Sequence, residues 1–378
     1  MNILIGSDIV LDKTNIDLFE SGCINTIIDK KVKDIIWNAT YSIFNLEVPL
    51  TDSWAPIEKQ GYHHYASTKC SYGLKKLGID LFTLANNHIM DQNTQGLLST
   101  INVLDQVGIS HVGAGINIDS AAEPFYKDID GRRIGIYACT EHEFSIASEG
   151  QPGANPFDPL YSLDHIQKMK EQSDFAIVLY HGGKEYYPYP SPRLQKTCRK
   201  IVEKGADLVV CQHSHCVGCK EKYLDGTIIY GQGDFIAYHS GKTNNISILI
   251  IIGDNNELDF VPIIQEDGVV RLTDEKEKSE ILEAFNKRSE DIKTDKFVDY
   301  SYRDFAKENI SSYLLFFTGL QTNLVFRIIN KISGYRLQSI IAQRIKQKYK
   351  IRLRNYIECE AHRDLILEGL DRICKLDS

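Results

Sequence analysis

The 378-residue chain is short of several features, and each absence limits what the protein can be. Its nine cysteines are an odd number and do not form the pattern of a disulfide framework in a chain of this size. The first ten residues, MNILIGSDIV, lack the basic segment and the long apolar stretch of a secretory signal, so they are interpreted as a buried strand. Together these absences predict a reducing, cytoplasmic compartment.

Basic residues do not predominate over the whole chain. Lys and Arg number 43 against 51 Asp and Glu, and the net charge of −8 argues against general nucleic-acid binding. Residues 309–357 are the exception, because they contain no Asp or Glu but nine basic side chains. The rest of the chain therefore has 34 basic residues against 51 acidic ones, a net charge of −17.

No uninterrupted apolar run suggests a membrane-spanning helix. The stretch 311–332 is strongly apolar, but Thr318-Gly319 and residues 321–323 interrupt it. Two interpretations of 309–357 remain open. The segment docks on the catalytic domain or on a second copy in a homodimer, or it lies peripherally on the anionic inner face of a membrane.

Short apolar runs alternate with helical patterns, which predicts an α/β fold with a mixed sheet or two stacked sheets flanked by helices. There is no internal repeat. The polar segment 267–280 is interpreted as a break between a catalytic-type domain, 1–270, and a helical region, 271–378. Strands are predicted at 2–7, 41–47, 80–85, 109–112, 133–139, 174–180 and 207–211, helices at 24–37, 70–77, 94–107 and 192–204, and closely spaced strands after Gly226.

Polar side chains follow the strand-like runs, where loops project them from a rigid scaffold. Two carboxylates, one amide and four imidazoles suit zinc, manganese or iron, and they exceed what one tetrahedral ion needs. Two ions that share a carboxylate, about 3.5–4 Å apart, would use them all and form the usual clamp for phosphoester hydrolysis. These residues are Asp8, Glu47, Asn87, His88, His181, His213 and His215.

Each of these residues also has a purely structural interpretation. Asp8 can be a helix N-cap, Glu47 a surface acid, and Asn87 part of a turn. The pair His213 and His215 is the strongest single signal, because alternate residues of an extended segment point the same way. Cys216-x-x-Cys219 is interpreted as two free thiols rather than as a redox pair or a zinc knuckle.

Six strings in order then carry a resemblance. They are GSD (6–8), NLEVPL (45–50), NNHIMDQNTQGL (86–97), HGGKEY (181–186), CQHSHCVGCKEKY (211–223) and YGQGDF (230–235). Over about residues 1–265 the chain resembles the CapA family of capsule-synthesis proteins, also called PgsA or PGA-cap. That family is similar in fold to the calcineurin-like metallophosphoesterases. The resemblance implies a four-layer α/β/β/α sandwich with a helical appendage after it.

The resemblance also implies roles. One ion would be held by Asp8, Glu47 and His215, and Glu47 would bridge to a second ion held by Asn87, His181 and His213. His88 would be the general acid, with Asp91 orienting it. From their own chemistry, Glu185, Tyr186, Arg193 and Asp234 are assigned to contact with substrate. Glu185 can instead support a ligand, and Tyr186 can instead pack over the sheet.

The chain departs from the pattern at several positions. Val10 stands where classical metallophosphoesterases have a histidine ligand, Ser214 replaces a proline, and Asp234 replaces an asparagine. The number of ions, one or two, therefore stays open. The sequence predicts a metal-dependent phosphoesterase in capsule, exopolysaccharide or poly-γ-glutamate biosynthesis, acting on a phosphorylated sugar, glycan or polymer. The alternatives are a non-catalytic accessory subunit of a synthase and an amide-bond hydrolase of the polymer.

Overall fold

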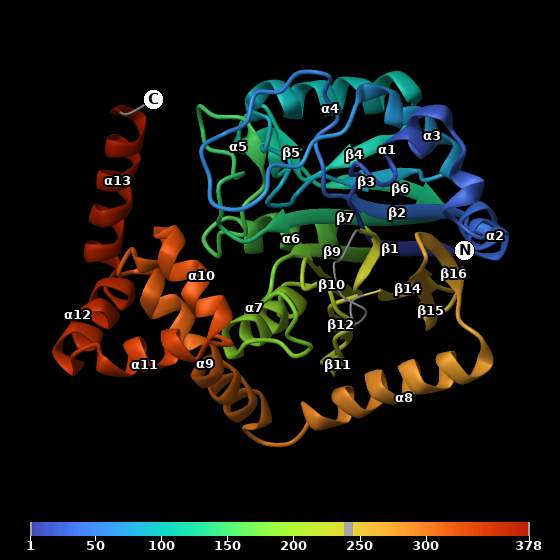
Figure 1. Ribbon diagram of the computed structural model, residues 1–378. Coiled ribbons are helices and arrows are strands. Elements are labelled where there is room, and N and C mark those ends of the chain that lie inside the picture. Colours follow the sequence, from blue (N-terminus) through green and yellow to red (C-terminus); the bar gives the residue numbers. More distant parts are fainter. Residues whose placement is uncertain (1, 238–244, 377–378) are drawn as a thin grey trace. The chain divides into compact units, whose positions relative to one another are not determined.

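The computed structural model describes residues 2–237 and 245–376, which fall into two compact units. Unit 1 is Met1–Asp299 and unit 2 is Tyr300–Ser378. Unit 1 contains every strand of the described residues (Figure 1). The division falls later in the chain than the predicted boundary after residue 270.

The first sheet of unit 1 has the strand order β16-β15-β14-β1-β2-β3-β4, with β13 also paired to β1. Strands β1 to β4 run parallel, and Asp8 of β1 lies opposite Asn45 of β2. The strands are β1 (Ile3–Ile9), β2 (Tyr41–Leu46), β3 (Leu81–Thr83), β4 (Ser110–Val112), β13 (Asp234–Ile236), β14 (Ile246–Ile252), β15 (Leu258–Glu266) and β16 (Val269–Leu272).

The second sheet has the order β11-β12-β10-β9-β7-β6, and its four central strands are parallel. A small pair, β5 (Ala114–Gly115) and β8 (Gly153–Ala154), stands apart. The strands of the second sheet are β6 (Phe125–Ile129), β7 (Arg132–Thr140), β9 (Phe175–His181), β10 (Leu208–Gln212), β11 (Lys220–Tyr223) and β12 (Gly226–Tyr230).

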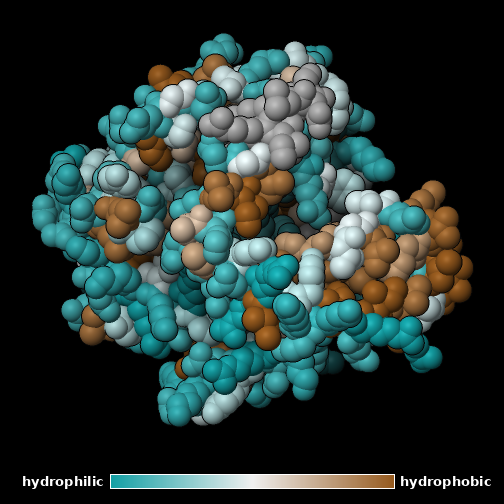
Figure 2. Space-filling model, turned by 90° about the vertical axis from the view of Figure 1, so that its left-hand side faces the viewer, coloured by the Kyte–Doolittle hydropathy of each residue, from teal (hydrophilic) through white to brown (hydrophobic). Residues whose placement is uncertain are grey.

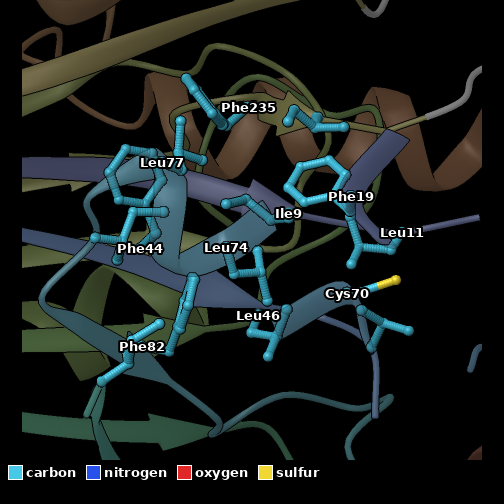
Figure 3. Close-up of a cluster of buried hydrophobic side chains, with 14 of the residues drawn as sticks. Ile9, Leu11, Phe19, Phe44, Leu46, Cys70, Leu74, Leu77, Phe82 and Phe235 are labelled. Carbon is cyan, nitrogen blue, oxygen red and sulfur yellow. The ribbon is translucent and has the colours of Figure 1, made fainter. Parts of the chain in front are cut away.

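The two sheets stack face to face because their strands are apolar on both sides. In β1, Ile3 and Ile5 join the cluster between the sheets, while Leu4 points to the outer cluster under the helices, as the two-residue period of a strand requires. Buried strands of parallel sheets read as continuous apolar runs for this reason. The outer cluster on the first sheet includes Phe19, Phe44, Leu74 and Phe82 (Figure 3), and Phe44 meets Phe235 edge to face.

Helices cover both outer faces, so the predicted four-layer α/β/β/α sandwich is confirmed (Figure 1). The first sheet is covered by α1 (Ile16–Ser21), α2 (Lys30–Asn38), α3 (Ser71–Leu77) and α4 (Asn93–Val107), and the second by α6 (Ser162–Glu171) and α7 (Pro192–Glu203). The short elements are η1 (Ile24–Thr26), η2 (Thr68–Cys70) and α5 (Ile118–Ala121).

Two predicted segments differ from the structure. The helix predicted over 24–37 is divided, because the Asp29 side chain accepts from the Lys31 N–H and begins α2 there. The polar segment 267–280 is not a break, since it forms β16 and the first turn of α8 (Glu275–Asp291). Its polarity has a local cause: β16 is an edge strand, and Arg271 binds Glu266 and Glu277 at its end.

Helix α9 (Phe297–Phe316) leads into unit 2, which is helical, as predicted for the C-terminal region. Few of its side chains are buried, among them Leu314, Leu315 and Ala342. No helix in the described ranges combines the length and the apolar character that crossing a bilayer requires. The further elements are η3 (Leu320–Thr322), α10 (Leu324–Ile332), α11 (Arg336–Arg344), α12 (Gln347–Glu358) and α13 (Glu360–Leu376).

Candidate metal centre

The predicted ligands come together at one end of the two stacked sheets. Parallel strands place their carboxyl ends along one edge, and loops after those ends form the usual site of an α/β fold. Asp8 lies near the end of β1, and Glu47 directly follows β2. His181 ends β9, and His213 directly follows β10 in the other sheet. The site is therefore built from both sheets.

Donor atoms of these side chains form three overlapping groups, and within each group they lie within 4.8 Å of one another. The groups are Asp8, Glu47 and His181; Glu47, His213 and His215; and Asp8, His215 and Asp234. Asp8, Glu47 and His215 each belong to two groups. The sets differ from the predicted ones, because His181 groups here with Asp8 and because Asp234 joins the cluster.

Distances between donor atoms fit ligands of one small cation. Nε2 of His181 is 3.1 Å from Oδ1 of Asn87 and 3.4 Å from Oε1 of Glu47. Ligands about 2.1 Å from one ion are separated by about 3.0–3.4 Å in octahedral or tetrahedral arrangements. The two distances are within this range.

Two buried donor atoms at the site have no hydrogen-bond partner within residues 2–237 and 245–376. They are Oε2 of Glu47 and Nδ1 of His213, and both residues are buried. Leaving such a group unsatisfied costs about 1–3 kcal/mol, and more for a charged group. A cation in the cluster would satisfy both, so the residues present fit a divalent metal ion.

The electrostatics of the cluster also favour a bound cation. Burial, reinforced by the charges of neighbouring carboxylates, raises the pKa of Asp8 to about 7. Burial also raises the pKa of Glu47 to about 7, although His215 and His88 oppose it. Burial lowers the pKa of His181 and of His213. The cluster thus concentrates acceptor groups with too little positive charge, which a divalent cation would supply.

Asp234 fixes the orientation of His215. Nδ1 of His215 is 3.0 Å and 3.2 Å from the two carboxylate oxygens of Asp234. Burial opposes the charged imidazole, but Asp234 outweighs it and raises the pKa of His215 to about 10. A carboxylate on one ring nitrogen leaves the other for an ion, a common arrangement around metals. The role predicted for Asp234, contact with substrate, stays a prediction.

Asn45 supports the cluster and was not among the predicted residues. Its Nδ2 donates to Oδ1 of Asp8 at 2.8 Å and lies 3.3 Å from Nδ1 of His181. Its Oδ1 accepts from Thr83 and Asn86, both at 3.0 Å, which fixes the orientation of the amide. The only signal in the sequence is its place two residues before Glu47 on β2, and nothing there distinguishes it from an ordinary strand residue.

His88 lies beside the cluster, and Asp91 fixes one of its ring nitrogens. Its Nδ1 is 2.7 Å from Oδ2 of Asp91, and its Nε2 is 3.9 Å from Oε1 of Glu47. Asp91 is itself fully buried, and although burial opposes its charge, the contacts with His88 and Lys59 lower its pKa. Lys59 pairs with the other oxygen of Asp91, and the N–H of His64 donates to Oδ2 at 2.6 Å.

A bend in the backbone, rather than the alternation of side chains along a strand, brings His213 and His215 together. His213 has φ of 87° and His215 has φ of 52°, both in the left-handed region that residues other than glycine seldom occupy. The expectation of an extended segment is therefore wrong, because β10 ends at Gln212 and the chain bends there. Strain of this kind often marks functional sites.

The residues assigned to substrate do not all lie next to the cluster. The ring of Tyr186 is half exposed, 5.6 Å from the ring of His215, and its φ is 59°. Glu185 pairs with Lys184 at 3.3 Å. Arg193 is exposed in the first turn of α7. The structure thus places Tyr186 next to the cluster and gives no contact of Arg193 or Glu185 with the ligands.

Val10, Cys216 and Cys219 agree with the sequence analysis. Val10 is buried and apolar, so it adds no ligand. Cys216 and Cys219 are free thiols, as predicted, and Cys139 and Cys211 are buried in strands.

Residues 3–239 match the family described as bacterial capsule synthesis protein PGA_cap, which is well over half of the chain. The chain belongs to this family. Within the PGA_cap match lie all of the predicted ligands, while unit 2 lies outside it.

Named relatives of this PGA_cap member come from several bacteria. Capsule biosynthesis protein CapA of Bacillus anthracis is 28% identical over 273 residues, which are 68% of this chain and 66% of that protein. PGA biosynthesis protein CapA of Bacillus subtilis is 27% identical over 244 residues, 61% and 64% of the two chains. A probable polyglutamine synthesis accessory protein of Mycobacterium tuberculosis is 29% identical over 171 residues, 42% and 45%. The matches span no more than 66% of these relatives.

Solved structures also align with the PGA_cap member. A phosphatase from Mycoplasma pneumoniae aligns with a TM-score of 0.44 at 11% identity, over 71% of this chain and 94% of that one. A putative 5′-nucleotidase from Staphylococcus aureus aligns with a TM-score of 0.41 at 15% identity, over 75% and 58%. Similarity at this level says nothing about activity.

Proposed function

We propose that this PGA_cap member is a metal-dependent hydrolase that cleaves phosphoesters in the biosynthesis of a capsule, an exopolysaccharide or poly-γ-glutamate. The observation that carries the proposal is the buried cluster at the strand ends, in which Glu47 and His213 each keep a donor atom without a hydrogen bond to the described residues. The names of the relatives suggest the biosynthetic setting.

One or two divalent ions, manganese, zinc or iron, would be held by Asp8, Glu47, Asn87, His181, His213 and His215. When bound, such ions activate a water molecule as nucleophile and draw charge from the phosphoryl oxygens. Val10 removes one ligand of the classical set. Asp234 adds a carboxylate opposite Asp8 in the β1–β13 pair, and it supports His215.

The protein's own part in bond cleavage is assigned to His88. Because its Nδ1 faces Asp91, its Nε2 is the nitrogen that faces Glu47 and the cluster. A proton held at Nε2 can pass to the leaving alkoxide, a contribution of typically about 10²–10⁴ in rate. Tyr186, Glu185 and Arg193 are assigned to the substrate, which would be a phosphorylated sugar, glycan or polymer.

A second candidate is a non-catalytic accessory subunit of a polymer synthase. The name of the Mycobacterium tuberculosis relative, an accessory protein, favours it. In that case the cluster would bind metal without turnover. Amide-bond hydrolysis of the polymer is a further outcome that a substrate screen would reveal.

The test compares metal content and turnover in four proteins. We expect His213→Ala to lose at least half of the bound metal measured by inductively coupled plasma mass spectrometry. His88→Asn should keep its metal but hydrolyse an aryl phosphodiester about 10²-fold or more slowly with Mn²⁺. His111→Ala is the matched control, because His111 lies on β4 and pairs with Asp105.

Each outcome of this experiment separates one of the candidate functions from the others. Equal metal content in the wild type and His213→Ala would contradict the metal centre. Metal binding without hydrolysis of any phosphomonoester or phosphodiester would favour the accessory subunit. Release of glutamate from a polyglutamate chain would instead identify the amide hydrolase.

A further inference from the structure

Helix α10 turns its apolar side toward solvent. Leu324 is 66% exposed, Ile328 52% and Ile332 80%. Val325 and Ile329 lie beside them and are exposed as well. At about 100° per residue these five side chains occupy one sector of about 140° around the helix. They are called the α10 face below.

The residue of α10 that faces the interior of unit 2 is polar. Asn330 is 3% exposed, its Nδ2 donates to Oε1 of Gln338, and its Oδ1 accepts from the N–H of Gln338, both at 3.0 Å. A surface helix of a soluble domain normally does the reverse and buries its apolar stripe. The α10 face is therefore not part of the core of unit 2. Hydrophobic surface of this kind is visible in brown in the space-filling view (Figure 2).

Positive charge lies along one edge of the α10 face. Arg327 and Lys331 are exposed and lie within about 60° of its edge around the helix axis. They belong to the segment 309–357, which has nine basic residues and no acidic one. An apolar face flanked by basic residues is typical of helices that lie in the interface of an anionic bilayer.

A second copy of the chain fits this face less well. A two-fold dimer brings the same patch of both subunits together. The basic edges of both copies would then lie at one interface, where like charges oppose association. Anionic headgroups beside acyl chains complement both properties of the face.

We propose that unit 2 binds the surface of an anionic membrane, with the α10 face among the acyl chains and the basic residues of 309–357 at the headgroups. This would hold the metal centre of unit 1 near a lipid surface. The proposal does not depend on what unit 1 catalyses, since no residue of the metal centre takes part.

The test uses the full chain and sedimentation with lipid vesicles. We expect vesicles with about 30% phosphatidylglycerol in phosphatidylcholine to bind at least tenfold more tightly than pure phosphatidylcholine vesicles. Raising NaCl to about 0.5 M should weaken binding, because salt screens the charges. Absence of binding to the anionic vesicles would overturn the proposal.

Two variants locate the contact. Ile332→Glu should weaken binding to the anionic vesicles about tenfold or more, while Leu160→Glu should leave it unchanged. Leu160 is a matched control because it is 75% exposed but belongs to unit 1. Both variants should keep wild-type circular dichroism and metal content. Equal binding by Ile332→Glu and the wild type would contradict the proposal, and so would a wild-type dimer that Ile332→Glu converts to monomer.

Discussion

At the scale of single residues, the candidate site depends on side chains that position others. Asn45 holds Asp8 and His181 in place, and Asp234 holds His215. Lys59 plays the same part for Asp91, which in turn faces His88. Outer partners of this type set the orientation of ligands and of catalytic groups, and removing them typically costs about 10–100-fold in affinity or activity.

The buried pair of Lys59 and Asp91 gives a stability prediction. Lys59→Met should lower the free energy of unfolding by about 3 kcal/mol, because it leaves a buried carboxylate without its cation. Both side chains are almost fully buried. The measurement is urea denaturation of the two proteins.

The control for this prediction is Lys287→Met. Lys287 pairs with Asp291 on the surface of α8, where its side chain is 75% exposed. Such exposed pairs contribute about 1 kcal/mol or less. Equal losses in the two variants would show that the Lys59 pair is no stronger than a surface pair.

At the scale of elements, the loop after β10 decides where the late histidines lie. It bends at His213 and His215 and then packs against the end of β12. The N–H of Gly218 donates to the carbonyl of Gly231 at 3.1 Å. A Cβ atom on Gly218 would come within 1.8 Å of the backbone oxygen of Tyr230, so only glycine allows this approach.

Gly218→Ala is therefore expected to move this loop. The backbone of β12 cannot yield as a flexible side chain would, and overpacking of this kind typically costs about 1–3 kcal/mol. The melting temperature should fall, and metal content should fall with it, because the loop carries two ligands. Gly150→Ala is the control, since no atom lies within 4 Å of its added Cβ. A wild-type metal content in Gly218→Ala would show that the loop does not need this close approach.

At the scale of the whole molecule, unit 1 continues past the family match and past residue 270. Helix α8 carries Ile281 and Phe285, which are buried in the cluster between the sheets. Asp274 and Glu277 form a capping box that begins the helix directly after β16. The helix therefore belongs to the core of the sandwich rather than to an appendage.

Two truncated chains test this. Residues 1–299 should fold, unfold cooperatively and bind metal like the full chain. Residues 1–270 should lose at least about 3 kcal/mol of stability, since removal of a buried Phe alone costs about 3–5 kcal/mol. Thermal unfolding and metal analysis measure both. A stable, metal-binding 1–270 fragment would support the predicted boundary after residue 270 instead.

Local patterns account for how much of the fold could be predicted. The apolar runs at 41–47, 133–139 and 174–180 correspond closely to β2, β7 and β9, because strands buried on both faces have no polar face to interrupt them. Elements with mixed composition were missed. Helix α6 and the edge strand β11 are examples, since α6 buries only one side, β11 has no fully buried residue, and both carry charged side chains.

The residues of the cluster could be found in the sequence for a similar reason, and their supporting partners could not. Asp8, Glu47, His181 and His213 each stand at the end of an apolar run, so their positions show in the sequence. Asn45 and Lys59 have no such mark. Lys59 lies in a polar loop, and only the folded chain brings it to Asp91, 32 positions further along.

The sequence by itself determined the α/β class and the place of the site, because the alternation of apolar runs and the polar residues at their ends are local features of the chain. Tertiary structure alone decided the grouping of ligands, the left-handed bend at His213 and His215, the inclusion of α8 in the core and the outward side of α10. These depend on contacts between residues far apart along the chain, and such contacts leave no periodic trace in it.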